Sequence, residues 1–189
     1  MRGPKRLIRV LPVAILAFAL VAALSPAAAS ASFCGKASRA PDELTGHQMR
    51  TSVLCLVNAA RERHGLRRLE FNRALRGSAT ALSLGMVRTG TFSHYVPGTS
   101  TMTGRATRFG YLSHVFRYRV AENIAAGQGR RHGSPLAIVR SWMRSAPHRA
   151  NILDPRLRDF GAGIARGDVL TGAGRGATYT LDFGARPRR

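Results

Sequence analysis

The stretch from Ser134 to Leu153, SPLAIVRSWMRSAPHRANIL, decides the fold class, because it holds a complete helix and the point where the chain turns toward its last strands. Ser134 is a good helix cap and Pro135 suits the first helical position, so a helix starts here. The apolar residues that follow are spaced to form one buried face: Leu136, Ile138, Val139, Trp142 and Met143. We expect Pro147 to end this helix and residues 148–153 to form a tight turn.

Strands follow this helix, and helices precede it. Downstream, Asp159–Arg166 and Ala177–Ala185 are predicted strands, joined by a glycine-rich segment that suits a hairpin. Helices early and strands late, without βαβ alternation, predict an α+β fold with a largely antiparallel sheet. The predicted upstream elements are a helix over about 45–64, a helix capped by Asn72 and ended by Gly90, a short helix from Thr103 to Phe109, and a buried strand at Ala121–Ala125.

The first 31 residues have the order of a secretory signal peptide. Four basic residues and no acid precede an apolar run from Val10 to Leu24, and small residues follow. This run is shorter than the roughly 20 residues that span a bilayer as a helix. The triplet Ala29-Ser30-Ala31 predicts cleavage near Ala31, with a retained N-terminal anchor as the alternative. Residues 32–44 are then an N-terminal arm and residues 45–186 a single domain with one core.

The composition is that of a folded protein with a strong excess of arginine. The chain of 189 residues is 44% hydrophobic and 21% charged. Without the four basic residues of the leader, the formal net charge falls from +21 to +17. Such a chain can adsorb to acidic polymers or anionic lipid. We attribute the charge to composition instead, because the arginines are scattered along the sequence and no stripe of interleaved aromatic residues accompanies them; nucleic acid is therefore not expected as a specific target. The sequence shows no heptad or evident sticky patch, so we expect a monomer.

The two cysteines fit an exported protein. Cys34 lies just after the expected cleavage site, and Cys55 falls about 120° away from the buried face of the first helix at 100° per residue. In an oxidising compartment such a cysteine is more often bridged than packed. We predict a Cys34–Cys55 disulfide, and two free thiols are the alternative.

The sequence lacks the short motifs of common enzyme classes, including the α/β-hydrolase, zinc-protease and nucleotide-binding motifs. Among the nine acids, we single out Glu122 as the one inside an apolar stretch, Ala121–Ala125. A buried carboxylate is costly unless it is paired or ligated. His94 and His148 follow helices in predicted turns, where they could converge on Glu122. Two imidazoles and one carboxylate match an open zinc site, and they match a structural hydrogen-bond cluster equally well.

Five blocks of the chain, in order, resemble the bacterial branch of the CAP superfamily, which includes the cysteine-rich secretory proteins, antigen 5 and the plant pathogenesis-related proteins. The blocks cover nearly the whole chain after the arm: Val57–Leu66, Phe92–His94, Glu122–Ile124, Trp142–Leu153 and Phe160–Gly163.

The resemblance implies a three-layer α-β-α sandwich with a central cleft. Members of the superfamily present up to two histidines and two acids in the cleft, and several bind a divalent metal there. His94, Glu122 and His148 match three of these four groups, and Ser145 stands where eukaryotic members have the second acid. The resemblance therefore implies a cleft of His94, Glu122, His148 and Ser145, with the first three as ligands of a divalent metal such as zinc. It implies no organic cofactor.

Two functions remain open at this point. The first is a secreted binding module whose cleft holds an extracellular ligand such as a lipid, an envelope polymer or a protein. The second is a metal-assisted hydrolase of peptide or cell-wall bonds, in which a bound zinc would activate water. We favour the binding module, because no second carboxylate at the matched positions could serve as the base. No residue is therefore assigned a catalytic role, and the chain is not expected to be an enzyme.

Overall fold

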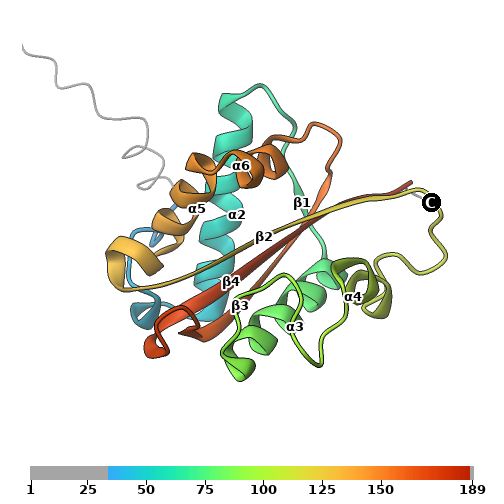
Figure 1. Ribbon diagram of the computed structural model, residues 1–189. Coiled ribbons are helices and arrows are strands. Elements are labelled where there is room, and N and C mark those ends of the chain that lie inside the picture. The colour runs from blue at the N-terminus through green and yellow to red at the C-terminus, as the bar shows by residue number, and fades with distance from the viewer. Residues whose placement is uncertain (1–33, 188–189) are drawn as a thin grey trace, which may run out of the picture.

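The computed structural model describes residues 34–187 and shows a three-layer sandwich. A four-stranded sheet forms the middle layer, with the strand order β1-β3-β4-β2. Figure 1 shows α2, α5 and α6 on one face of this sheet and α3 and α4 on the other. The predicted signal peptide lies outside the described residues, and within them no helix is long and apolar enough to cross a membrane.

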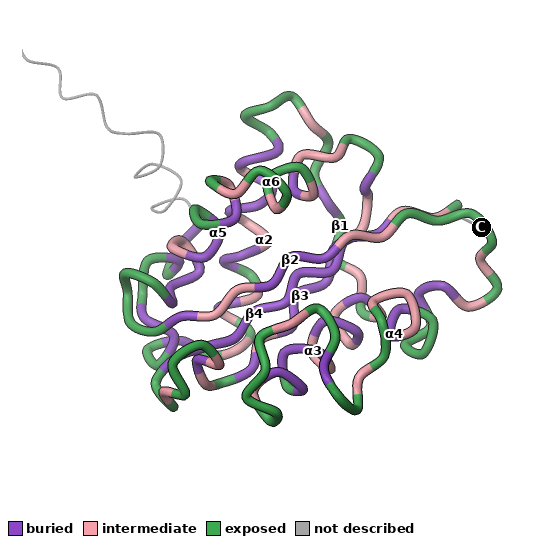
Figure 2. The backbone as a smooth tube through the Cα atoms, in the orientation of Figure 1, coloured by how far each residue is buried: buried purple, intermediate pink, exposed green. Residues whose placement is uncertain are grey.

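The sheet is largely antiparallel, as predicted. Strand β3 (Asp159–Asp168) and strand β4 (Ala173–Ala185) form the predicted hairpin, and β2 (Arg119–Gln128) pairs antiparallel with β4. The two-residue strand β1 (Glu70–Phe71) pairs parallel with β3, and the sequence analysis missed it. Figure 2 shows the middle of the sheet buried between the helical layers.

The first two long helices begin and end where the sequence predicts. Helix α2 (Gly46–Arg63) starts at Thr45 with a reciprocal capping box, in which Thr45 and Gln48 bond each other's backbone N–H. Helix α3 (Arg73–Thr89) is capped by the Asn72 side chain and ends at Gly90, which has the left-handed φ of 66°. The short 3-10 helix η1 (Pro41–Glu43) precedes α2.

Two expectations about helices are wrong. Helix α4 (Met102–Arg108) is capped by Thr101, whose hydroxyl accepts from the Gly104 N–H, instead of by Thr103. After α5 (Pro135–Arg144), residues 148–153 belong to a further helix, α6 (Ala146–Leu153), instead of a tight turn. Pro147 lies in the first turn of α6, where a missing N–H costs nothing, so this proline starts a helix as well as separating two. A single π-helical turn, η2 (Gly129–Gly133), links β2 to α5.

The core has two sides, one on each face of the sheet. The larger side packs α2, α5 and α6 on the sheet around Trp142 and Phe160, and the smaller side packs α3 and α4 on it through Leu75, Leu82 and Met86. The predicted disulfide is present: Cys34 and Cys55 are bonded, with their Cα atoms 5.7 Å apart. It ties the N-terminal arm to α2.

Candidate functional site

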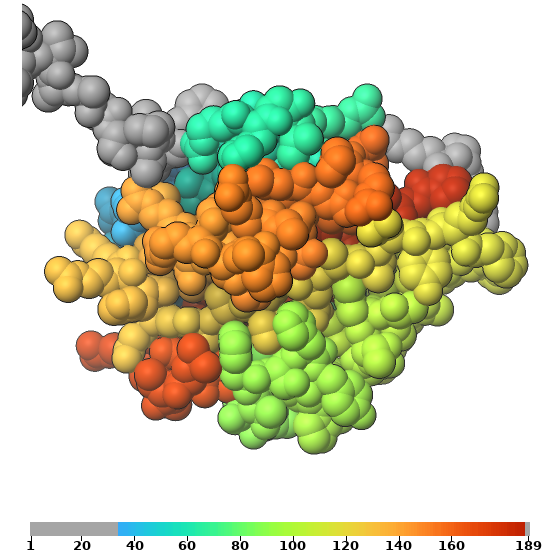
Figure 3. Space-filling model, turned by 45° about the horizontal axis from the view of Figure 1, so that its top comes forward, coloured from blue at the N-terminus to red at the C-terminus, as the bar shows by residue number. Residues whose placement is uncertain are grey.

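The candidate site lies along β2, which is an edge strand of the sheet. Side chains alternate between the faces of a strand, so neighbouring residues of β2 serve different layers. Glu122 contacts residues from the layer of α3 and α4, whereas Asn123 contacts α6. Figure 3 shows a furrow between the segment that links α3 to α4, in light green, and α6, in orange, with β2 in yellow at its base.

Glu122 is the buried carboxylate that the sequence predicts, and both of its oxygens are engaged. Its Oε1 lies 2.7 Å from Nδ1 of His94, in the segment after α3. Its Oε2 accepts a hydrogen bond from Arg105 of α4, and this pair is a salt bridge with both side chains almost fully buried. A buried charge pair of this kind is strongly coupled, because removing one partner leaves the other unpaired in the interior. The His94 side chain is 57% exposed, so it links the buried Glu122 carboxylate to the protein surface.

Arg105 is the functional neighbour that sequence reasoning missed. It is 2% exposed, and it also donates to the Ser100 carbonyl oxygen at 2.6 Å. Nothing in the sequence distinguishes it from the other arginines, because its burial depends on α4 lying against β2.

Asp182 is a second buried carboxylate at this site. It is fully buried and stands directly opposite Glu122 in the β2–β4 pairing. Burial raises the pKa of Asp182 well above its ordinary value, and the negative charge of Glu122 raises it further. Neither oxygen of Asp182 has a hydrogen-bond partner among the described residues. The view that Glu122 is the one acid in an apolar stretch is therefore wrong, since Asp182 lies between Leu181 and Phe183.

His148 reaches the furrow from the opposite layer. Its Nδ1 lies 2.9 Å from Oγ of Ser145, so the residue at the position of the missing second acid contacts a histidine. Partial burial lowers the pKa of His148, and the charge of nearby His94 lowers it further. The structure thus arranges the four predicted cleft residues as two pairs, His94 with Glu122 and His148 with Ser145, on the two sides of β2.

Two asparagines join α6 to β2. Asn123 donates to the His148 carbonyl oxygen at 3.1 Å, and Asn151 donates to the Asn123 side chain at 2.9 Å and to the Glu122 carbonyl oxygen at 3.3 Å. The indole N–H of Trp142 similarly bonds the Ile124 carbonyl oxygen at 3.0 Å. These side chains occupy backbone acceptors of the edge strand and hold the His148 side of the furrow in place.

The donor set does not fit a metal ion in this arrangement. Among residues 34–187, no three His, Cys, Asp or Glu side chains come together as a possible metal site. Glu122 has one oxygen bonded to the cation of Arg105 and the other to His94, so a metal would have to displace one of them. The predicted ligand set of His94, Glu122 and His148 remains a prediction.

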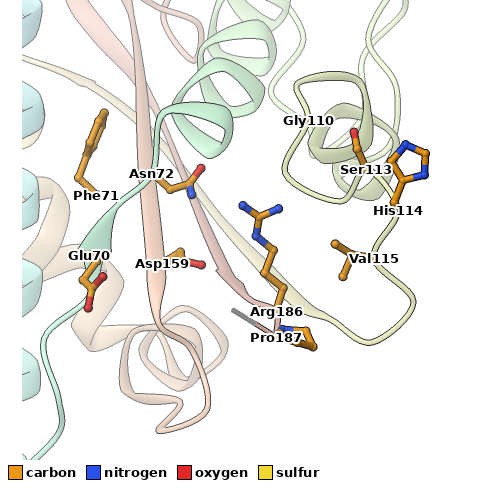
Figure 4. Close-up of a pocket in the computed structure, with 10 residues that line it drawn as sticks. All are labelled: Glu70, Phe71, Asn72, Gly110, Ser113, His114, Val115, Asp159, Arg186 and Pro187. Carbon is orange, nitrogen blue, oxygen red and sulfur yellow. The ribbon is translucent and has the colours of Figure 1, made fainter. Parts of the chain in front are cut away.

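A separate hollow of about 660 Å³ lies at the other side of the sheet, near β1 and the C-terminal end of β4. Figure 4 shows Arg186 extending into it between Asn72 and Val115, with Asp159 on the sheet side. Asp159 accepts a hydrogen bond from the buried Tyr111 hydroxyl at 2.6 Å, and together with burial this raises the pKa of that phenol beyond its ordinary range. None of the predicted cleft residues lines this hollow.

Comparison with known proteins gives consistent results. The model of the cysteine-rich secretory protein (CAP) family matches residues 54–182. An uncharacterized Bacillus subtilis protein, YkwD, is 32% identical over 149 residues, which is 78% of this chain and 54% of that protein. The chain therefore spans about half the length of this relative.

Two solved structures are similar in fold. An extracellular protein containing an SCP domain from Bacillus anthracis has a TM-score of 0.60 and 26% identity, covering 74% of this chain and 43% of that one. An outer surface protein from Borrelia burgdorferi has a TM-score of 0.62 and 15% identity, covering 76% of this chain and 97% of that one. The second likeness concerns the fold alone.

Proposed function

Because this chain belongs to the cysteine-rich secretory protein (CAP) family, we propose that it is an exported binding module whose furrow along β2 holds a polymer of the cell envelope or extracellular space. The observation that carries the proposal is that both oxygens of Glu122 are already bonded, to Arg105 and to His94. Glu122 is then a support that orients an exposed imidazole, and it is not free to act as a general base or a ligand.

The exposed groups around the furrow suit recognition of an extended polar chain. His94 and His148 offer imidazole nitrogens, and Phe92 and Tyr95 are exposed aromatic side chains next to His94. Aromatic faces with polar groups beside them pack against sugar rings or peptide bonds while hydrogen bonds set the register. The description of the 26% identical Bacillus anthracis protein as extracellular supports a location outside the cytoplasmic membrane.

Co-sedimentation with purified cell-wall sacculi tests this proposal. We expect the wild-type domain to sediment with the sacculi and the double variant His94→Ala/His148→Ala to lose most of that binding. The matched control is His47→Ala/His132→Ala, which removes two exposed histidines outside the furrow. Equal binding by all three proteins would reject the furrow as the binding site.

A hydrolase remains the alternative function, and a chemical assay separates it from binding. Incubation with peptidoglycan or a peptide library, with and without chelator, should release no new fragments. Fragment release that Glu122→Gln abolishes would replace the binding proposal with a hydrolase.

Metal binding is tested on its own. Zinc titration followed by calorimetry should give the same result for the wild type and for His94→Ala/His148→Ala, because Arg105 already neutralises Glu122. Stoichiometric zinc uptake by the wild type alone would show that Arg105 or His94 leaves Glu122 when metal is present, and it would restore the three-ligand site.

A further inference from the structure

Five arginines that are scattered along the sequence gather at one end of the sheet. They come from three separate segments: the start of β2, the turn between α6 and β3, and the residue after β4. The pairing of Arg119 with Ala185, and the hydrogen bond from the Arg158 N–H to the Gly184 carbonyl oxygen, bring these segments together. An open hollow of about 350 Å³ is lined by Arg117, Tyr118, Arg119, Arg156, Arg158 and Arg186. We call this surface the arginine end.

The positive charge of the arginine end is mostly uncompensated. Within residues 34–187, the ion pairs that these five arginines form all go to Asp154, which bonds Arg156 at 2.9 Å and lies 3.6 Å from Arg119. Arg158 donates to backbone carbonyl oxygens instead. The whole segment from Arg73 to Ala121 contains no Asp or Glu. Two acids lie close to the five guanidinium groups, Asp154 and, beside Arg186 in the neighbouring hollow, Asp159. The arginine end therefore keeps a net positive charge that attracts a surface of phosphate groups, which arginine binds through paired N–H donors.

Aromatic side chains project beside these arginines. Phe116 is 96% exposed, and Tyr118 is 47% exposed. They alternate with arginines in the sequence Phe116-Arg117-Tyr118-Arg119. The expectation that no aromatic residues interleave with the arginines is therefore wrong at this segment.

The base of the loop that carries Phe116 is firmly packed. Tyr111 is fully buried, its carbonyl oxygen accepts from Arg186 at 2.6 Å, and the Arg186 guanidinium lies 4.7 Å from the centre of its ring. Leu112 is also buried, whereas the residues from His114 onward turn outward at a left-handed φ of 59°. The Phe116 side chain is therefore exposed to solvent, whereas the start of its loop, at Tyr111 and Leu112, is packed in the core.

We propose that the arginine end is a docking surface for a membrane whose lipids carry anionic phosphate head groups. The arginines contact the head groups, and Phe116 and Tyr118 enter the interfacial layer, where aromatic residues are favoured. A soluble polyanion would use the arginines and gain little from Phe116, whereas a lipid surface uses both. Among the described residues, neither Phe116 nor any of these five arginines forms a hydrogen bond or ion pair with the four predicted cleft residues, which lie further along β2 and in the flanking layers.

Vesicle flotation tests the proposal, with phosphatidylcholine vesicles that contain or lack phosphatidylglycerol. We expect the wild-type domain to float with the anionic vesicles and to remain in solution with the neutral ones. Arg117→Gln/Arg158→Gln should weaken partitioning by about thirtyfold. Phe116→Ala should weaken it on the order of tenfold, and its melting temperature should not change because the side chain is solvent-exposed.

The chain offers matched controls at the opposite end of β2. A second arginine cluster there includes Arg131 and Arg140, so Arg131→Gln/Arg140→Gln makes the same change in net charge. Leu170→Ala removes a 59% exposed apolar side chain from the β3–β4 turn. Both controls should bind anionic vesicles like the wild type.

Three results would overturn the proposal. Equal weakening by the two arginine pairs would mean adsorption by net charge. Equal binding to neutral and anionic vesicles would remove the role of the phosphates. Loss through the Arg117 and Arg158 changes with full binding by Phe116→Ala would assign the surface to a soluble polyanion instead of a membrane.

Discussion

Glu122 and Asp182 face each other directly across the β2–β4 pairing. Arg105 forms a buried salt bridge with Glu122, whereas burial and the neighbouring charge of Glu122 raise the pKa of Asp182 well above its ordinary value. Two adjacent buried carboxylates cannot both carry a charge at low cost. The raised pKa keeps Asp182 uncharged over a wider pH range than an exposed aspartate, which lowers the cost of burying it beside Glu122.

The raised pKa of Asp182 gives a stability prediction with a definite sign. The folded state holds a proton that the unfolded chain releases above its ordinary pKa, so the free energy of unfolding falls as pH rises from about 4 toward the folded-state pKa. Asp182→Asn should therefore unfold at a higher temperature than the wild type at neutral pH and at nearly the same temperature at pH 4. Calorimetry across this range checks it, and a wild-type stability that does not fall with pH would contradict it.

Loss of Arg105 should be severe. Arg105→Met leaves Glu122 as an unpaired charge in the interior, and we expect a loss of about 3–5 kcal/mol in the free energy of unfolding, measured by urea titration. The double variant Arg105→Met/Glu122→Gln should recover most of this loss, because it removes both charges. Equal stability of the single and double variants would show that the two charges are not coupled.

The disulfide should contribute about 3 kcal/mol, since Cys34 and Cys55 close a loop 21 residues apart in the sequence. Reducing agent should lower the melting temperature of the wild type. Cys34→Ala/Cys55→Ala should melt near the reduced wild type and be insensitive to the reductant. A wild-type melting temperature unchanged by complete reduction would contradict this.

Close packing of α3 on β3 should make Gly163 irreplaceable. A Cβ there would lie 2.1 Å from the Ala79 carbonyl carbon and 2.2 Å from the Thr80 nitrogen, both backbone atoms that cannot rotate away. Gly163→Ala should cost about 3 kcal/mol of unfolding free energy. Gly174→Ala is the control, because a Cβ on that strand residue meets nothing within 4 Å. Similar denaturation midpoints for the two variants would contradict the argument.

The sequence could predict those parts of the fold that local chemistry determines. Asn72 and Gly90 bound α3 because a side-chain cap and a left-handed glycine act within a few residues. Pro147 misled the prediction because the same residue suits both a helix end and the first turn of the next helix, and only packing of α6 on β2 decides between them.

The candidate-site residues likewise divide into those that local sequence can identify and those that only tertiary packing brings together. Glu122 could be found because an acid in an apolar stretch needs a partner. Its partner could not be predicted, because Arg105 is 17 residues away in the sequence and reaches Glu122 only through the packing of α4 on β2. Asp182 also lies between apolar residues, Leu181 and Phe183, so its burial could have been predicted. Its position opposite Glu122 depends on the strand register, which the sequence does not show.

Gly161 and Gly163 of β3 lie against α3, and because they have no Cβ the backbone of the helix can pack directly on the strand. The segment that carries His94 begins where α3 ends, so the packing of α3 on β3, on the same face of the sheet, helps to set the position of that imidazole relative to β2. Phe92 and Tyr95 are exposed and lie outside this helix-to-strand contact, so substituting them should change what the furrow binds while the packing of α3 on β3 stays the same.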